Sequence, residues 1–175
     1  MNWKRLFSLS DNGASLVTLY HNARHDERTL LVIRTDDSDV FGVYASQCWR
    51  PRGEEYFGTG ECSLFSVRRR NTADSPALPS DAPVGHIEER DVDRPPEIAV
   101  SGIVERHRWT YANNLFMLAT PARIAVGGGG NFAIMLDDEL LQGSSGACET
   151  FGTSRSLGSS EMFRVREVEL WGFWV

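Results

Sequence analysis

The order of apolar and polar residues along the chain predicts a protein built mainly of short β-strands. Residues 29–34 and 40–46 form two nearly continuous apolar runs, separated by the turn sequence DDSD at 36–39. A strand that is buried on both faces shows no alternation of polar and apolar residues. We therefore expect these two strands near the centre of a sheet, and two consecutive strands of this kind favour a sandwich with helical cover.

Residues 123–141, RIAVGGGGNFAIMLDDELL, predict an antiparallel hairpin. Apolar runs stand on both sides of the four glycines at 127–130, and glycine readily adopts the positive φ angles of tight reversals. The glycines do not fit a phosphate-binding motif. The Gly-Lys-Ser/Thr ending is absent, and Phe132 or Ala133 replaces the last glycine of Gly-x-Gly-x-x-Gly. We therefore predict a structural turn and no cofactor.

Further strands are predicted at 63–67, 103–111, 115–119 and 162–175. The second and third of these, together with the hairpin, have the short spacing of an antiparallel meander. Along the terminal segment the apolar alternation changes phase. A bulge near Arg166 and Glu167 is the simplest way to keep both sets of apolar residues directed inward.

An amphipathic helix is predicted at 14–25, with Ser15 as its N-cap. Its apolar face consists of Leu16, Leu19, Tyr20 and Ala23. A helix with one such face packs against a sheet. The pattern as a whole therefore predicts a mainly β fold with flanking helices, arranged as an antiparallel β-sandwich.

The length of 175 residues fits a single domain, 1–175, with one insertion. Residues 71–104 contain five of the chain's seven prolines and few large apolar residues. Such a composition does not support a core strand or helix. We expect a proline-rich insertion over this range, with regular structure on either side of it.

Charge and cysteine usage narrow the classes of function. The formal net charge is -6 and the isoelectric point is near 5.2, which argues against a nucleic-acid partner because phosphate binding depends on basic surface. The three cysteines form no Cys-x-x-Cys pair and favour a reducing, cytoplasmic setting. No apolar run approaches the roughly 20 residues of a membrane span.

Cysteines and one carboxylate are the candidate reactive groups. Cys62 and Cys148 each stand beside a glutamate, which disfavours the thiolate, whereas Cys48 has Arg50 nearby. Glu61 lies between a glycine-rich turn and a strand, where we expect it to accept backbone N–H bonds. A redox-active or hydrolytic domain that uses a cysteine or Glu61 is the alternative function.

Two histidines have the spacing of metal ligands on a helix. His21 and His25 lie four residues apart, as two ligands on a helix do, but no third ligand follows at a suitable distance. Histidines near the end of a helix are ordinarily surface cations. We therefore predict no metal site. Since the candidate reactive groups do not assemble into a catalytic constellation in the sequence, we also predict no catalytic residue and no enzyme activity.

The candidate partner surface is assigned to loops that we expect to be exposed. Its residues are Trp49, Arg50, Glu61, Gly127, Gly128, Gly129 and Gly130. Each of them also has a purely structural interpretation. Trp49 can cover an apolar edge, Glu61 can accept hydrogen bonds from its loop, and the glycines can form a turn.

Taken together, these segments resemble the TLDc domain family. The residues that carry the resemblance are WKRLFSLSDNGASLVTLY, TLLVIRTDDSDVFGVYAS with Trp49, YFGTGECSLF, RWTYANNLF, IAVGGGGNFAIMLDDELLQG, residues 148–151 and EVELWGF. They cover nearly the whole chain outside the insertion. The long insertion makes the chain most similar to the TBC–TLDc proteins of the Skywalker type.

The resemblance implies a β-sandwich flanked by helices, without an established catalytic site. Family members are linked to protection against oxidative stress and to binding the vacuolar-type proton pump. Skywalker-type proteins act in synaptic vesicle and endosomal trafficking, with Rab GTPase activation and phosphoinositide binding in a TBC domain that these residues lack. The resemblance thus implies a cytoplasmic interaction domain from the C-terminal part of a longer protein, peripheral to vesicle and endosomal membranes.

Two kinds of partner follow from this resemblance. The first is a subunit of the proton pump or a vesicle protein, bound by exposed loops. The second is the TBC domain of the same chain, through which the protein would reach phosphoinositide membranes. In that alternative the domain is an accessory that orients the GTPase-activating domain.

Overall fold

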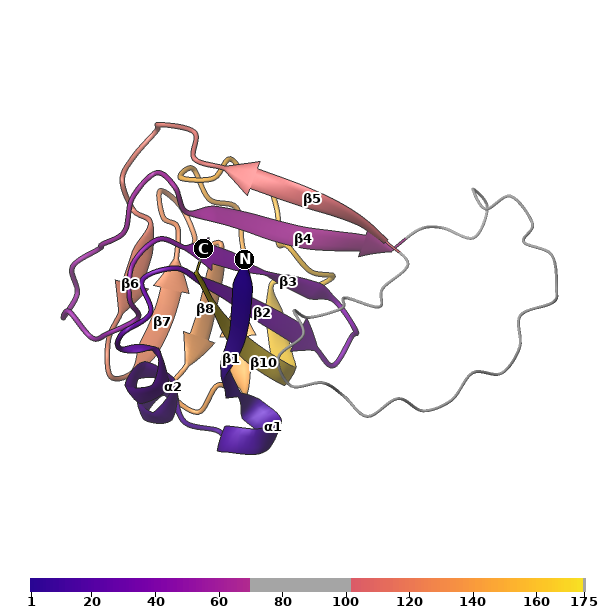
Figure 1. Cartoon of the computed structure of the whole chain (residues 1–175). Coiled ribbons are helices and arrows are strands. Elements are labelled where there is room, and N and C mark those ends of the chain that lie inside the picture. Colours follow the sequence, from indigo (N-terminus) through magenta and orange to yellow (C-terminus); the bar gives the residue numbers. More distant parts are fainter. Residues whose placement is uncertain (70–101, 175) are drawn as a thin grey trace, which may run out of the picture.

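The computed structural model describes residues 1–69 and 102–174. The chain forms two antiparallel layers that share one strand (Figure 1). The first sheet contains β5 (Gly102–Arg108), β4 (Ser63–Arg69), β3 (Val40–Ala45), β2 (Thr29–Thr35), β10 (Met162–Trp174) and β1 (Asn2–Ser8). The second contains β6 (Met117–Ala119), β7 (Arg123–Val126), β8 (Ile134–Asp137), β9 (Gln142–Ser144) and the beginning of β10. The predicted antiparallel β-sandwich is therefore confirmed.

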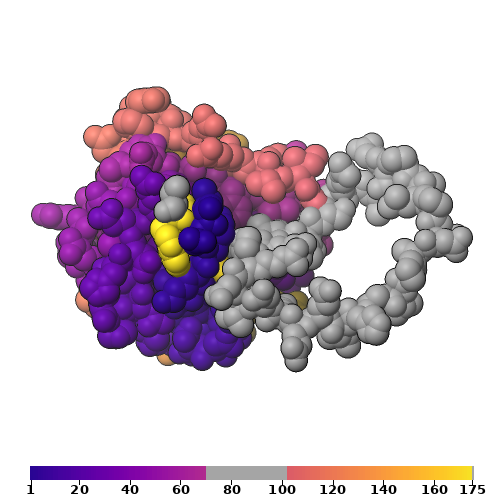
Figure 2. All heavy atoms as spheres, in the orientation of Figure 1, coloured from indigo at the N-terminus to yellow at the C-terminus, as the bar shows by residue number. Residues whose placement is uncertain are grey.

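Strand β10 joins the two sheets. Its first residues, from Met162, pair with β9, and its later residues pair with β2 on one side and β1 on the other. The register with β2 shifts between Val165 and Glu167. This shift confirms the predicted bulge, which lets one strand leave the second sheet and enter the first. As a result, Asn2 pairs with Trp174, and the two ends of the described chain lie side by side (Figure 2).

The core lies between the sheets and explains why β2 and β3 are apolar on nearly every position. Both strands are central in the first sheet, as predicted. Leu31, Ile33, Phe41 and Val43 point into the main core and are fully buried. Alternate residues of the same strands, such as Val32 and Val40, form a smaller apolar cluster with Trp171 on the other face.

Helices close one side of the sandwich. Helix α2 (Leu16–Ala23) begins at Ser15, whose hydroxyl accepts a hydrogen bond from the Thr18 amide. Its buried residues are Leu16, Leu19, Tyr20 and Ala23, as predicted, and its ends are two residues inside the predicted range 14–25. The Tyr20 hydroxyl donates to the Thr120 carbonyl at 2.7 Å and ties the helix to the second sheet.

Three details of the fold differ from the sequence expectations. Helix α1 (Leu9–Asn12) is not among the predicted elements; Ser8 caps it, and Glu167 accepts hydrogen bonds from its first amides. Strands β1 and β9 were not predicted. Strand β5 pairs with β4 rather than with β6, so the predicted meander comprises only β6 to β9.

The predicted insertion falls mainly outside the described residues. Residues 71–101 of the predicted insertion lie outside the described residues, and Gly102, Ile103 and Val104 belong to β5. Strand β4 reaches Arg69 on the other side. The two strands that flank the insertion are therefore neighbours in the first sheet.

Candidate functional site

The glycine loop connects β7 and β8, as the hairpin prediction requires. Gly127, Gly129 and Gly130 have φ angles of 82°, 73° and 130°. Residues with a Cβ atom rarely adopt these angles, so the loop needs glycine for its backbone path. The glycines of this hairpin therefore have a conformational role that is independent of any partner.

Two of the four glycines are buried, which corrects the expectation that all of them lie on an exposed loop. A Cβ atom at Gly127 would lie 2.5 Å from the Cys148 sulfur, and one at Gly128 would lie 2.6 Å from Leu115 Cδ1. Gly127 and Gly128 are thus enclosed by neighbouring loops. Gly129 is half-buried, and Gly130 is the only one of the four that is exposed.

Thr150 fastens these loops to one another. Its fully buried hydroxyl accepts a hydrogen bond from the Gly128 amide at 3.0 Å and donates to Asn113 Oδ1 at 2.6 Å. The Glu149 amide donates to the Gly128 carbonyl at 3.0 Å. Segments 109–116, 127–130 and 148–152, together with 58–62, form one cluster that we call the motif end. In the cluster, Gly60 lies against the Trp109 ring, where a Cβ atom would approach to 2.2 Å.

Trp49 is a core residue, which corrects its assignment to an exposed partner surface. The side chain has 0% exposure, and its ring meets Phe57 edge-on at 6.4 Å between centroids. The indole N–H donates to Thr29 Oγ1 at 3.1 Å, so its one polar group is satisfied inside the protein. Its neighbour Arg50 is exposed.

Glu61 is exposed, but it does not hold its loop together. Within the part of the chain that the structure describes, its carboxylate accepts no hydrogen bond, contrary to expectation. The loop is instead fixed by hydroxyl groups. Ser46 Oγ accepts the Thr59 amide at 3.0 Å, and Thr59 Oγ1 accepts the Glu61 amide at 3.3 Å. Glu61 therefore remains available at the surface.

The three cysteines are free thiols. Burial and then the nearby Glu27 carboxylate raise the pKa of Cys48, and Arg50 offsets this only in part. Cys62 and Cys148 are buried, and Cys62 shares a 3.2 Å hydrogen bond with the Ser46 hydroxyl. A nucleophilic thiol needs the thiolate and access to solvent. The environments of these three residues do not favour thiol chemistry.

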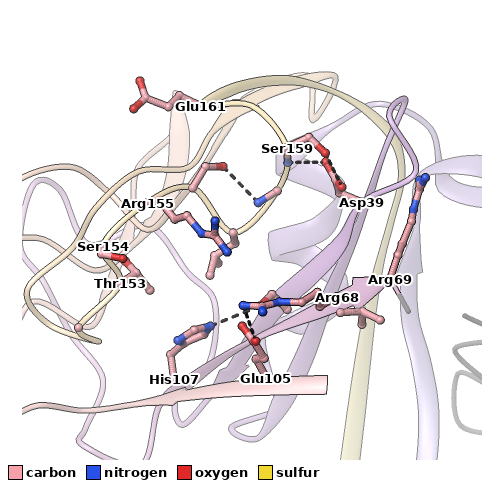
Figure 3. Close-up of a pocket in the computed structure, with 16 residues that line it drawn as sticks. Asp39, Arg68, Arg69, Glu105, His107, Thr153, Ser154, Arg155, Ser159 and Glu161 are labelled. Carbon is pink, nitrogen blue, oxygen red and sulfur yellow. Dashed lines mark hydrogen bonds and ion pairs between the residues drawn. The ribbon is translucent and has the colours of Figure 1, made fainter. Parts of the chain in front are cut away.

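A polar groove of about 830 Å³ runs between strands β4 and β5 and the loop 152–161 (Figure 3). Hydroxyl groups and charges of both signs line it, and Arg69, Arg155 and Glu161 are among the charged residues. Arg68 forms a 2.7 Å ion pair with Glu105, while Asp39 accepts hydrogen bonds from both the amide and the hydroxyl of Ser159, at 2.7 and 2.8 Å. Sequence reasoning missed this groove, because it is made by residues from separate segments without a motif.

One hydroxyl and one imidazole meet at the base of the groove. Ser66 Oγ lies 3.4 Å from His107 Nε2, at the long limit of a hydrogen bond. Burial lowers the pKa of His107, although the nearby Glu105 acts in the opposite direction. A serine–histidine nucleophile also needs a carboxylate that orients the imidazole, and Glu105 is instead engaged by Arg68. Within residues 1–69 and 102–174 the pair therefore lacks the third member of a catalytic triad.

The predicted histidine pair contacts an arginine. Arg24 lies within hydrogen-bonding distance of both rings, at 2.8 Å from His21 and 2.9 Å from His25. Among residues 1–69 and 102–174, no group of three or more possible ligands could hold a metal ion. No helix in the same residues is long and apolar enough to cross a membrane.

Comparison with known proteins identifies relatives over nearly the whole chain. The family model described as the TLDc domain matches residues 1–76 and 100–174. The GTPase-activating protein skywalker of Drosophila melanogaster is 30% identical over 96% of the chain. Oxidation resistance protein 1 is 32% identical over 97% of the chain in Podospora anserina and 30% identical over 98% in Homo sapiens. The chain spans 26%, 52% and 16% of the lengths of these three proteins.

Proposed function

The chain belongs to the TLDc domain family, and from that premise we propose that it is a non-catalytic interaction domain. Its role is protection against oxidative stress, together with trafficking at vesicle or endosomal membranes. The observation that carries this proposal is its similarity to both oxidation resistance proteins and skywalker. Packing supports it, because the motif residues that distinguish the sequence serve the fold rather than a reactive centre.

The proposed partner is a subunit of the vacuolar-type proton pump or a vesicle protein, which the chain binds on the cytoplasmic side of the membrane. After the burial of Trp49, Gly127 and Gly128 is taken into account, the remaining candidate surface consists of Arg50, Glu61, Gly129 and Gly130. Both charged residues are exposed. They provide a direct way to test the surface without disturbing the core.

The test is capture of the pump from solubilised membranes by the purified chain. The double variant Arg50→Glu with Glu61→Lys keeps the net charge and is expected to lose capture. The matched control Lys4→Glu with Glu139→Lys exchanges two other exposed charges and is expected to retain it. Retained capture by the first variant would refute this surface. If the wild type fails to capture the pump under all salt and nucleotide conditions, the pump is refuted as partner.

The non-catalytic part of the proposal has a separate test in cells. A variant with alanine at Cys48, Cys62 and Cys148 removes all thiol chemistry, and its folding is checked by its thermal unfolding transition. In cells that lack their own oxidation resistance protein, we expect it to protect against peroxide as the wild type does. Loss of protection by a folded variant would instead support a redox-active domain.

A second candidate function rests on the similarity to skywalker, whose name describes a GTPase-activating protein. In such a protein the domain would act as an accessory that orients a TBC domain, which would in turn contact phosphoinositide membranes. Comparison of GTPase activation by the longer protein with and without this domain tests the idea. An unchanged rate on membranes would exclude it.

A further inference from the structure

The first sheet ends in two edge strands, and they differ in how well they are protected against pairing with another chain. Exposed edges are usually blunted by charges, bulges, short length or a covering loop. Strand β1 has a register shift between Arg5 and Phe7, whereas both edges carry exposed charges. At the edge of the second sheet, β6 has only three residues and is bonded to the loop between β3 and β4 through Phe57 and Arg52.

Strand β5 has neither a bulge nor a short length. Its seven residues pair with β4 in continuous register from Gly102 to Arg108, and within residues 1–69 and 102–174 this is its only partner strand (Figure 1). Ile103 and Val104 on this strand are 56% and 60% exposed. A straight edge with exposed β-branched residues is suited to the addition of another strand.

The charge on one face of β5 indicates what kind of strand fits. Val104, Arg106 and Arg108 alternate along the strand, so they share a face, and all three are exposed. Arg106 donates to the Ser63 hydroxyl at 3.2 Å. Within the described residues neither arginine forms an ion pair with a carboxylate. A second copy of the chain would bring like charges together, whereas a strand with acidic residues on this face would be attracted.

The opposite face of β5 borders the polar groove. Glu105 and His107 point into it, beside Ser66 and Arg68 of β4 (Figure 3). A strand added next to β5 would place alternate side chains at the mouth of this groove and the others beside Arg106 and Arg108. Small polar side chains match the first position, because the groove is lined by hydroxyl groups and by charges of both signs.

We propose that β5 accepts an extended acidic segment of a partner protein as an added strand. Main-chain hydrogen bonds to the open edge supply affinity, and glutamate or aspartate side chains facing Arg106 and Arg108 supply selectivity. This inference rests on the proposed role as an interaction domain and names a surface and a partner chemistry for it.

The probe is a synthetic peptide of about nine residues that alternates threonine and glutamate, added to the whole chain with labelled backbone amides. We expect chemical-shift changes centred on β5 and an affinity that falls as salt is raised. The variant Arg106→Glu with Arg108→Glu should bind about tenfold more weakly and should favour a threonine–lysine peptide instead. The control Lys4→Glu with Arg24→Glu changes the net charge equally, away from β5, and should largely keep the wild-type affinity.

Proline substitutions in β5 test the contribution of main-chain hydrogen bonds to peptide binding separately from that of the arginine charges. Neighbouring residues of an edge strand direct their N–H groups in opposite directions. Of Val104 and Glu105, one therefore donates its N–H toward β4 and the other directs it away from the sheet. Proline at the second position removes the outward N–H donor and leaves the hydrogen bonds to β4 intact. The variant that keeps the wild-type unfolding transition should lose the peptide. If neither folds, the charge-reversal variant decides the question.

Equal binding of both peptides, or shift changes away from β5, would overturn the inference. Retained binding by a folded proline variant that lacks the outward donor would also overturn it. If the glutamate peptide does not bind while the chain still captures a protein partner, only the inference fails. If the chain neither captures a partner nor protects cells, the proposed function fails, whatever the peptide does.

Discussion

The motif end and the β5 edge use their residues in opposite ways. At the motif end, glycines, a threonine and aromatic rings are packed so tightly that a single added carbon would collide with a neighbour. At β5, exposed side chains border a groove and an edge that pairs with no second strand among the described residues. The difference teaches that the most distinctive stretches of this sequence define the shape of the loops, whereas the surface best suited to recognition is made of ordinary strand residues.

The largest expected effect tests whether the residues that distinguish the sequence are structural. Trp49→Ala should lower the free energy of unfolding by about 3–5 kcal/mol, because it removes a fully buried ring and leaves a cavity. Tyr111→Ala is the control, since Tyr111 is 78% exposed and only stacks on Trp109, and it should lose about 1 kcal/mol at most. Urea unfolding measures both, and a small loss for Trp49→Ala would contradict its role in the core.

The next effect separates crowding from backbone strain at the glycine loop. Gly127→Ala should cost about 2–3 kcal/mol, because it combines an unfavourable φ with a collision at Cys148. Gly13→Ala is the matched control, because Gly13 has nearly the same φ, 83°, but no atom within 4 Å of the added carbon. This variant should lose about 1 kcal/mol of unfolding free energy. Equal losses in the two variants would show that the motif end is less tightly packed than described.

Loss of one hydroxyl should loosen the motif end without changing its volume. Thr150→Val leaves the Gly128 amide and the Asn113 side chain without their buried partner, which should cost about 1–3 kcal/mol. The exposed Thr59→Val removes a hydroxyl from a neighbouring loop and should cost less than about 1 kcal/mol. Faster amide exchange at residues 127–130 in Thr150→Val alone is the second readout.

The smallest effect concerns the groove and depends on pH. Burial lowers the pKa of His107 below its ordinary 6.5, so the unfolded chain takes up a proton more readily than the folded one. Stability should therefore fall as the pH drops from about 6.5 through the lowered pKa. His107→Gln should reduce this loss between about pH 7.5 and 5.5, whereas Ser66→Ala should retain it. Identical pH profiles for the wild type and His107→Gln would show that the imidazole is not appreciably desolvated.

Strand positions were predictable because they depend on local patterns. The double-sided apolar runs gave β2 and β3, the change of phase gave the bulge in β10, and helical spacing gave the buried face of α2. Strand β9 was missed because its three residues, Gln142–Ser144, are polar or small. Its place in the sheet comes from pairing with β8 and β10, which no local pattern records.

Burial at the candidate site was harder to predict, because it depends on contacts between distant segments. Trp49 lies four residues after the end of β3 and two before Pro51, which suggests an exposed loop, yet Thr29 and Phe57 enclose it. Gly127 and Gly128 look like a free turn until the segments 109–116 and 148–152 close over them. The sequence signal that could have indicated this burial is the concentration of small residues, which permits close approach of neighbouring loops.

The position of β10 has a consequence for how the protein is made. A ribosome delivers this strand after all the other described ones, yet β1, β2 and β9 all pair with it. Before β10 is made, the edges of β1, β2 and β9 that pair with it are without their partner, so we expect that intermediate to be prone to pairing with other chains. A chain that ended before Met162 would lack the strand that joins the two sheets.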